Sequence, residues 1–353
     1  QHLKKPMTHT DETYMRRCLQ IATAGARDVA PNPMVGAVLV KDEQIIGEGY
    51  HQRYGTAHAE PNAIAAVKDE SLLQECTLYV NLEPCSHYGK TPPCAELIIK
   101  KQIPRVVIGM LDPNPLVAGR GVKMLEDAGV EVKVGVLEKE CRELNKRFIC
   151  YHEKHRPYIV LKWAQSADGF IDKLRESRDE PVAVLSSPFT KQLVHKMRAE
   201  NMAILVGTRT ALLDNPGLRT TRWDGNNPLR IVLDRTGKIP DESKIFDGKS
   251  HTLIFTEKTD YKEHDNTTIC PIDFANQCWQ QVMDQLYQMK IHSLIVEGGS
   301  QVLNDLLRQQ LWDEIQVETS PTILNDGVEA PHFHAILSGE EHYDGHIIRH
   351  YRK

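Results

Sequence analysis

One histidine and two cysteines constrain the fold of this chain more than any other feature of the sequence. His58 is followed by Ala59 and Glu60, Cys85 closes a Leu-Glu-Pro-Cys run, and Cys94 follows a Thr-Pro-Pro run. One imidazole and two thiolates give a zinc ion three ligands and leave its fourth tetrahedral position open to water. The sequence therefore predicts that these three side chains converge on a catalytic zinc ion.

Glu60 adds a proton carrier to this predicted metal site. It follows His58 by two residues, which places it close to the metal without having to bind it. Zinc lowers the pKa of water from 15.7 towards about 7, and a neighbouring carboxylate can pass the released proton to a departing amine. A single cysteine is more often a small buried hydrophobe. The joint pattern, with His-x-Glu opening one helix and Cys94 opening another, instead indicates the chemistry of zinc nucleobase deaminases.

Length and composition narrow the class of protein. The 353 residues suffice for two domains, and a net charge of −5 with interspersed signs argues against nucleic acid as a partner. Eight cysteines in a chain of this size are better interpreted as ligands or buried thiols than as a disulfide framework. No apolar stretch reaches membrane-spanning length, and residues 1–6 lack the apolar core of a secretory signal. We expect a cytoplasmic protein without a membrane partner.

Helical and strand-like segments alternate along the first half. We expect helices over residues 10–24, 60–68, 94–101, 119–128 and 138–150, and strands over residues 35–40, 77–81, 105–109 and 130–136. This alternation predicts a largely parallel sheet covered by helices. The polar run 152–157, which ends in a proline, indicates a domain boundary.

The second half begins a new α/β pattern. We expect strands over residues 158–163, 203–206, 229–234, 252–255 and 294–296, and a helix over 188–199 with Ser187 as its N-cap. No Gly-x-Gly-x-x-Gly follows a strand, so a Rossmann fold is not supported. The last strand instead leads through Gly298 and Gly299 into a helix, where a phosphate can approach the backbone. An ordinary tight turn explains the two glycines equally well.

The run from Glu83 to Cys94 is more specific than the general motif, because eight residues separate its cysteines instead of two. It resembles the deaminase domain of the RibD family of bifunctional riboflavin biosynthesis enzymes, as do residues 31–36, 47–51, 112–115 and 117–121. The resemblance implies a cytidine-deaminase-like three-layer α/β/α domain at residues 7–151. It also implies a zinc-dependent pyrimidine deaminase acting at C2 of 2,5-diamino-6-ribosylamino-4(3H)-pyrimidinone 5′-phosphate.

The same resemblance implies contacts to this phosphorylated aminopyrimidine ribotide. The expected substrate-binding residues are Asn32, His51, Lys90, Asp112 and Asn114. The helix start Gly119-Arg120-Gly121 offers backbone amides and a cation suited to phosphate. For the two asparagines, ordinary turn chemistry is an open alternative.

The second half resembles the reductase domain of the same family in residues 161–162, 166–169, 204–208, 214–216, 230–234 and 297–299. The resemblance implies a dihydrofolate-reductase-like α/β domain at residues 156–353 that reduces the ribosyl group to ribityl with NADPH. The expected substrate and cofactor contacts are Lys162, Ser166, Asp168, Arg198, Gly207, Thr208, Asp214, Arg222, Asp234, Glu297, Gly298 and Gly299. Lys162, Asp214 and Glu297 are expected nearest the opened sugar. Arg198 and Arg222 are expected to hold the 5′-phosphate through charge-assisted bonds.

One stretch departs from the family. Residues 171–180 are charged and lack the tryptophan that the family usually has near its cofactor, and we interpret them as a surface insertion. The leading hypothesis is a bifunctional homo-oligomeric enzyme that uses Zn²⁺ and NADPH. One alternative keeps the deaminase but makes the second half a non-catalytic oligomerisation or binding domain. Another is a tRNA or nucleoside deaminase, against which the charge and the cysteine spacing both argue.

Overall fold

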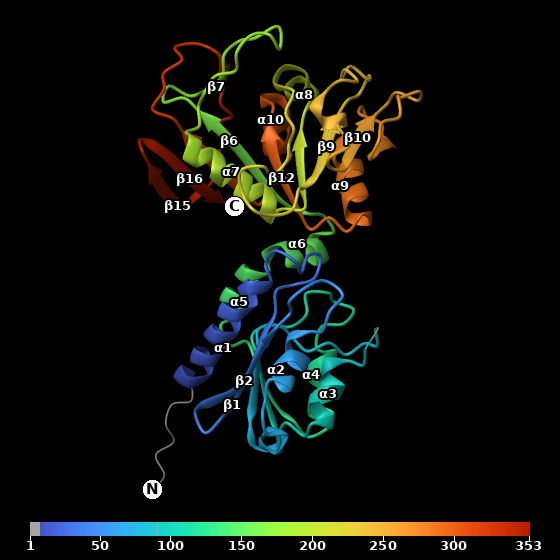
Figure 1. Cartoon of the computed structure of the whole chain (residues 1–353), viewed down its shortest axis with the longest axis vertical. Coiled ribbons are helices and arrows are strands. Elements are labelled where there is room, and N and C mark those ends of the chain that lie inside the picture. Colours follow the sequence, from blue (N-terminus) through green and yellow to red (C-terminus); the bar gives the residue numbers. More distant parts are fainter. Residues whose placement is uncertain (1–7, 90) are drawn as a thin grey trace. The chain divides into compact units, whose positions relative to one another are not determined.

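The chain folds into two compact units, each with its own sheet and core (Figure 1). The computed structural model describes residues 8–89 and 91–353. The first unit ends at Lys154 and the second begins at His155. Over the described residues, no helix combines the length and the apolar character needed to cross a membrane.

The sheet of the first unit is mixed. Its strands are β1 (Gly36–Lys41), β2 (Gln44–Tyr50), β3 (Thr77–Val80), β4 (Arg105–Ile108) and β5 (Glu131–Val134), in the order β2-β1-β3-β4-β5. β3, β4 and β5 are parallel, but β1 is antiparallel to both of its neighbours. The prediction of a largely parallel sheet is therefore wrong for the part of the sheet that β1 and β2 form. Asp42 and Glu43 both have positive φ angles, and such a two-residue turn folds β2 directly back on β1.

Helices cover both faces of this sheet and make three layers. They are α1 (Thr8–Ala22), α2 (Ala59–Ala65), α3 (Cys94–Lys100), α4 (Arg120–Asp127), α5 (Glu138–Leu144) and α6 (Lys146–Lys154), with short 3₁₀ turns at Thr23–Gly25 and Glu70–Glu75. α1 and α5 lie on one side of the sheet, and α2, α3 and α4 lie on the other (Figure 1). The fully buried strand residues Val38, Leu39 and Val107 belong to the core between these layers.

The closing helix expected over residues 138–150 is in fact two helices. Asn145 interrupts it with a non-helical backbone conformation. The Asn145 side chain accepts a hydrogen bond from the Met34 amide at 2.8 Å and donates one to the Met34 carbonyl at 2.8 Å. Asn145 thus leaves the helix because it anchors a loop far away in the sequence. α6 then continues through Lys154, past the end expected for the first domain.

The second unit contains a long, mostly parallel sheet. Its strands are β6 (Tyr158–Gln165), β8 (Ala203–Val206), β9 (Leu229–Leu233), β10 (Thr252–Thr256), β11 (Thr267–Pro271), β12 (Ser293–Gly298), β13 (Glu314–Thr319), β15 (Ile336–Tyr343) and β16 (His346–Arg352), in the order β11-β10-β9-β8-β12-β6-β13-β16-β15. Among the described strands of this sheet, β16 alone runs in the opposite direction, antiparallel to both of its neighbours, β13 and β15. The short strands β7 (Phe170–Asp172) and β14 (Val328–Glu329) pair separately. All five strands expected in this half are confirmed; the others were not predicted.

Both faces of this sheet are buried. The helices of the second unit are α7 (Pro188–Glu200), α8 (Thr208–Asp214), α9 (Cys278–Gln288) and α10 (Ser300–Arg308), with a 3₁₀ turn at Lys244–Phe246. Leu205 of β8 packs into one core with residues of α9 and α10, and Ile204 packs into another with Ala211 of α8. Ser187 caps α7 as predicted, because its hydroxyl accepts the Thr190 amide at 3.1 Å.

Residues 171–180 lie mostly at the surface, as the predicted insertion would, but Arg175 ties the run to the second unit. The Arg175 side chain is only 4% exposed. Its guanidinium donates to Asp172 at 2.8 Å and also to Asp214 at the end of α8. The neighbouring Arg178 donates to the Leu212 carbonyl at 2.9 Å. One cation of this charged run is thus buried because it finds carboxylates there.

Candidate active sites

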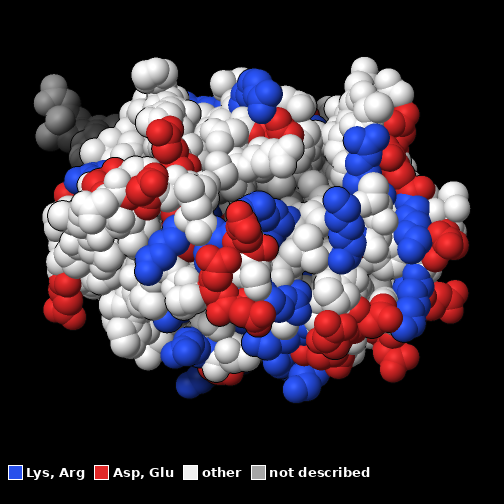
Figure 2. Space-filling model, turned by 90° about the horizontal axis from the view of Figure 1, so that it is seen from above, with Lys and Arg blue, Asp and Glu red and all other residues white. Residues whose placement is uncertain are grey.

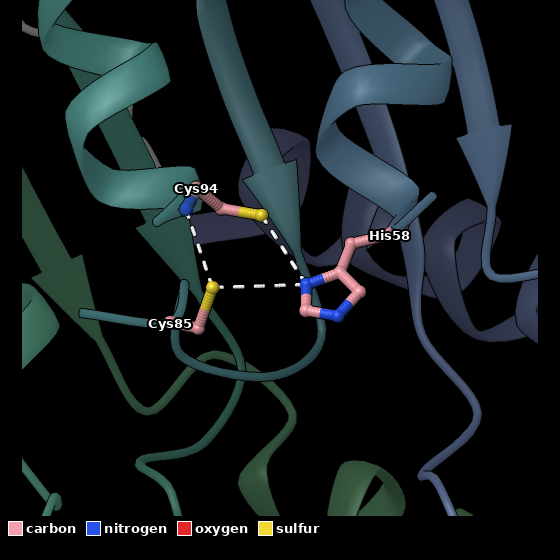
Figure 3. A group of neighbouring side chains, drawn as sticks. All are labelled: His58, Cys85 and Cys94. Atoms are coloured by element: carbon pink, nitrogen blue, oxygen red, sulfur yellow. Dashed lines mark hydrogen bonds between the residues drawn. The ribbon is translucent and has the colours of Figure 1, made fainter. Parts of the chain in front are cut away.

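His58, Cys85 and Cys94 converge from three separate segments of the first unit (Figure 3). His58 immediately precedes α2, Cys94 is the first residue of α3, and Cys85 lies on the loop after β3. One ligand atom from each lies within 4.8 Å of the others. His58 Nδ1 faces both sulfurs, at 3.4 Å from Cys94 Sγ and 3.7 Å from Cys85 Sγ. Across the described residues, no other set of three or more histidine, cysteine or acidic side chains brings its ligand atoms close enough together to hold a metal ion.

The chemistry of this group fits zinc. Two sulfurs and one imidazole nitrogen are a common zinc donor set, and zinc binds cysteine as thiolate. A hydrogen bond from Cys94 lowers the pKa of the Cys85 thiol to about 4, and His58 acts in the same direction. The pKa of Cys94 is raised by the same bond, because its thiol keeps the shared proton. The Cys94 amide also donates to Cys85 Sγ at 3.2 Å, which stabilises the thiolate.

Glu60 lies beside these ligands, in the first turn of α2, and is 3% exposed. Burial raises the pKa of its carboxyl to about 7, and the nearby Cys85 adds to the shift. A group whose pKa is near neutral both accepts and releases protons readily at physiological pH. Glu60 therefore has the protonation behaviour expected of a general acid and base.

His51 and Asn32 lie on the histidine side of the metal group. The His51 and His58 rings meet edge to face, with centroids 5.6 Å apart. His51 Nε2 lies 3.0 Å from Asn32 Nδ2, which can only donate, so Nε2 accepts. His51 Nδ1 then carries the proton and donates to the Ala57 carbonyl at 3.0 Å. Burial lowers the pKa of His51, which favours this neutral ring.

Asp112 and Asn114 form a turn. The Asp112 carboxylate accepts the Asn114 amide at 2.8 Å, and the Asn114 side chain accepts the Leu116 amide at 3.0 Å. The alternative of turn chemistry thus describes how Asn114 is held in this structure. Lys90, also expected to contact the substrate, lies outside the described residues.

Glu83 occupies the start of α4, where a phosphate was expected. Its carboxylate accepts the amides of Gly119 at 3.0 Å, Gly121 at 2.9 Å and Val122 at 3.1 Å. It also accepts the Asp112 amide at 3.0 Å. The prediction that the Gly119–Gly121 amides bind substrate phosphate is therefore wrong, because a carboxylate of the chain already takes them. Sequence reasoning missed Glu83, although it stands in the same run as Cys85.

Comparison with known proteins identifies both halves. Residues 8–110 match the cytidine and deoxycytidylate deaminase zinc-binding region, and residues 157–332 match the RibD C-terminal domain. The chain is 40% identical over 338 residues to riboflavin biosynthesis protein RibD of Bacillus amyloliquefaciens, covering 94% of this chain and 88% of that protein. This chain belongs to the RibD family.

Other RibD proteins agree. RibD of Aquifex aeolicus is 38% identical over 325 residues, covering 90% of this chain and 89% of that protein. The crystal structure of the Thermotoga maritima diaminohydroxyphosphoribosylaminopyrimidine deaminase/5-amino-6-(5-phosphoribosylamino)uracil reductase superimposes with a TM-score of 0.87 at 34% identity, covering 98% of this chain and 99% of that one. Like the RibD family, this chain is a bifunctional deaminase and reductase of riboflavin biosynthesis, with a cytidine-deaminase-like first domain and a dihydrofolate-reductase-like second domain.

The charged residues expected in the RibD reductase domain gather on neighbouring strands. Val296 of β12 pairs with Leu161 of β6, so Glu297 and Lys162 follow at the same level of adjacent parallel strands. Burial alone would raise the pKa of Glu297. Its bond to Arg198 and the nearby charge of Lys162 outweigh burial and lower the pKa, so the carboxylate is ionised.

Arg198 was expected to hold the 5′-phosphate. Its guanidinium is instead bound to the Glu297 carboxylate. Arg198 Nε donates to Glu297 Oε1 at 3.0 Å and Nη2 donates to Oε2 at 2.6 Å. Its remaining nitrogen, Nη1, donates to the Arg219 carbonyl at 3.1 Å. Arg222, the other expected phosphate ligand, is exposed on the same loop as Arg219.

Two predicted glycine segments meet at the ends of the neighbouring strands β8 and β12. The Gly207 amide donates to the Gly298 carbonyl at 3.1 Å. The Gly299 amide donates to Thr210 Oγ1 at 2.9 Å, and the φ of Gly299 is +38°. A side chain at Gly207 would approach the Val302 side chain to 2.8 Å. Sequence reasoning missed Thr210, which holds the Gly298–Gly299 turn; Thr208 instead donates to the Leu233 carbonyl.

Ser166 and Asp168 organise the turn after β6. The Ser166 hydroxyl accepts the Phe170 amide at 2.9 Å and is fully buried. The Asp168 carboxylate accepts the amides of Leu324 at 3.1 Å and Asn325 at 2.7 Å. Both side chains therefore hold the backbone around this turn.

Asp234 and Asp214 are also engaged with the protein. Asp234 is fully buried and accepts the amides of residues 238 and 239 and the Tyr261 hydroxyl, at 2.7 Å for the last. Its expected contact with ligand is replaced by these internal bonds, since they satisfy the buried carboxylate. Asp214 is half-buried and pairs with Arg175.

Proposed function

We propose that the chain deaminates 2,5-diamino-6-ribosylamino-4(3H)-pyrimidinone 5′-phosphate at C2 and then reduces the ribosyl group of the product to ribityl with NADPH. We assign the first reaction to residues 7–151 and the second to residues 156–353. The observation that carries the proposal is the convergence of His58, Cys85 and Cys94 beside the buried Glu60 in a chain of the RibD family. The Thermotoga maritima relative, whose name couples a deaminase of this class with a reductase, supports it.

Glu60 is the proton carrier of the proposed deamination. His58, Cys85 and Cys94 would hold the zinc ion, whose Lewis acidity would make water a stronger nucleophile at neutral pH. Glu60 takes a proton from the attacking water and returns it to the leaving amine, so that ammonia departs neutral. Its pKa of about 7 suits both transfers. Asn32 orients the edge of the pyrimidine ring with its carbonyl oxygen, while His51 holds the Asn32 side chain at 3.0 Å.

In the proposed reduction, NADPH supplies the hydride and the protein supplies position and charge. The Gly298–Gly299 turn precedes α10, and the backbone at such a strand-to-helix turn suits the phosphates of a dinucleotide. Lys162 and Glu297 bind the opened sugar in this proposal, and their position on adjacent strands supports it. Asp214, oriented by Arg175, is a further polar contact for it.

The proposed partners are small molecules and further copies of this chain. On the face shown in Figure 2, basic and acidic side chains are interspersed, with no broad region of one sign. Nucleic-acid binding needs a concentrated basic surface, so this face does not favour that alternative. A homo-oligomer stays a prediction, and light scattering on the purified protein measures it.

A coupled assay tests the proposal. The zinc-loaded protein is mixed with the ribotide, with and without NADPH, and ammonia release and NADPH absorbance are followed. We expect the wild-type protein to release ammonia in both reactions and to oxidise NADPH in the second. Glu60→Ala should release no ammonia, and should oxidise NADPH only when it receives the deaminated intermediate. Ammonia without NADPH oxidation, even from authentic intermediate, would favour a non-catalytic second domain. Turnover of cytidine or tRNA adenosine in place of the ribotide would overturn the substrate assignment.

A further inference from the structure

Helix α7 holds the backbone of residues 219–223 with a side chain that sequence reasoning did not single out. His195 Nδ1 lies 2.9 Å from the Thr221 amide and 3.3 Å from the Arg222 amide, and both amides donate to it. One turn further along the same helix, Arg198 donates to the Arg219 carbonyl at 3.1 Å. Two side chains of α7 therefore replace the backbone partners that this loop lacks.

Two other contacts fix the same loop. Lys196 of α7 lies 5.7 Å from the ring centroid of Trp223. The Thr220 amide donates to the Asn227 side chain at 2.8 Å. The loop is therefore held at successive residues, although its side chains at Arg222 and Trp223 are exposed.

The bonds to His195 define its protonation. Backbone amides only donate, so Nδ1 is the unprotonated nitrogen and the ring proton is on Nε2. Burial, with the nearby charge of Arg198, lowers the pKa of His195 to about 4. The ring is therefore neutral, and its hold on the loop persists, at every pH near neutrality.

His195 also lies among the charged residues of the reductase site. Arg198, Glu297, Arg222 and Lys162 are all close enough for their charges to affect it. Arg198 is committed to Glu297, whereas the exposed Arg222 side chain projects from the loop that His195 holds. A guanidinium presented on a fixed backbone suits a phosphate better than one on a mobile loop, because less conformational entropy is lost on binding.

We infer that His195 is a positioning residue of the reductase, which fixes residues 221–222 so that Arg222 binds the 5′-phosphate of the substrate. This role rests on the proposed function, because it assumes a phosphorylated substrate in the second domain. It adds to the reaction a residue that touches neither the substrate nor the cofactor.

The test compares His195→Ala with His195→Asn in the full-length protein. Asparagine Oδ1 takes nearly the place of histidine Nδ1 and accepts the same amides, whereas alanine accepts nothing. For reduction of the deaminated intermediate, we expect His195→Ala to raise KM about ten- to a hundred-fold with kcat little changed. His195→Asn should restore most of the affinity. Lys191→Ala, an exposed change on the same helix, is the control and should behave as wild type.

The dephosphorylated intermediate and a double variant separate positioning from general support of the fold. His195→Ala should leave KM for the dephosphorylated compound unchanged, and should add nothing to Arg222→Ala, because it acts through that arginine. Equal losses on both compounds, additive losses in the double variant, or no recovery with asparagine would overturn the inference.

A second measurement does not depend on turnover. If wild type does not reduce the intermediate at all, the proposed function fails, and hydrogen exchange with inorganic phosphate then decides the role of His195. Phosphate should slow exchange over residues 219–223 in wild type and His195→Asn but not in His195→Ala. Absence of protection in wild type would overturn the inference.

Discussion

Arg198 holds Glu297 through two parallel hydrogen bonds, Nε to Oε1 at 3.0 Å and Nη2 to Oε2 at 2.6 Å. Both side chains are at most 14% exposed, so the pair is largely removed from water. Removing one partner of such a pair leaves a buried charge uncompensated, and lysine cannot reproduce the two-pronged geometry of arginine. The pair therefore fixes where the Glu297 carboxylate points beside Lys162.

We expect Arg198→Lys to lower kcat/KM for reduction of the deaminated intermediate about 100-fold, which corresponds to roughly 3 kcal/mol. Ammonia release by the same protein should stay within a factor of two, because Arg198 belongs to the other unit. NADPH absorbance and an ammonia assay on one preparation give both numbers. Equal loss of the two activities would show that the variant damages the protein generally.

Glu83→Gln should weaken the first domain. The glutamine amide nitrogen would face backbone N–H groups that now donate to an oxygen of Glu83. Hydrogen bonds to charged groups contribute about 1.5–3 kcal/mol each, so we expect the free energy of unfolding of this domain to fall by about 3 kcal/mol. Urea denaturation, monitored through the ability of the protein to release ammonia from the ribotide, measures this loss of stability.

Glu75→Gln is the matched control for Glu83→Gln. Glu75 pairs with Lys41 at the surface, and its side chain is 67% exposed. Exposed pairs contribute about 0–1 kcal/mol, so this change should be nearly neutral. A similar loss from both variants would contradict the account of Glu83.

Asp11 should make the first domain sensitive to acid. Its carboxylate accepts bonds from Tyr79 at 2.9 Å, from Arg105 at 3.1 Å and from Lys133 at 2.8 Å. Burial alone would raise the pKa of Asp11, but these bonds outweigh it and lower the pKa. The stability that they contribute is complete above the unfolded pKa of about 3.9 and is lost as pH falls through the lower folded value.

We therefore expect Asp11→Asn to lower the free energy of unfolding by about 3 kcal/mol at pH 7, with the difference from wild type shrinking below about pH 4. Urea denaturation of both proteins in chelator, at pH 7 and at acid pH, measures this difference without a contribution from zinc. A difference that grows in acid would have the wrong sign for a carboxylate with a lowered pKa.

Sequence patterns predicted the elements whose residues carry a clear periodicity. β8 was predicted residue for residue, because all four of its side chains are apolar and buried. β15 was missed because nearly all of its side chains are exposed, so no alternation of apolar and polar residues marks it. It is a strand only because β16 pairs with it.

The metal ligands were predictable because few combinations of residue types serve that chemistry. Contacts between a side chain and a distant backbone were not. Asn145 bonds to Met34, 111 residues away, and interrupts a helix that its own neighbours favour. Arg175 lies in a run that looks exposed, and its partner Asp214 is 39 residues away. Such pairs depend on the tertiary fold, which local patterns do not encode.

Glu60 carries the proposed deamination, and a separate site carries the reduction. Glu60→Gln keeps the size of the side chain and removes its ability to exchange a proton, so it separates the two activities. We expect zinc content equal to wild type, ammonia release from the ribotide reduced at least 100-fold, and normal NADPH oxidation with the deaminated intermediate. Ammonia release near the wild-type rate, or equal loss of both activities in a folded, zinc-loaded protein, would contradict the account.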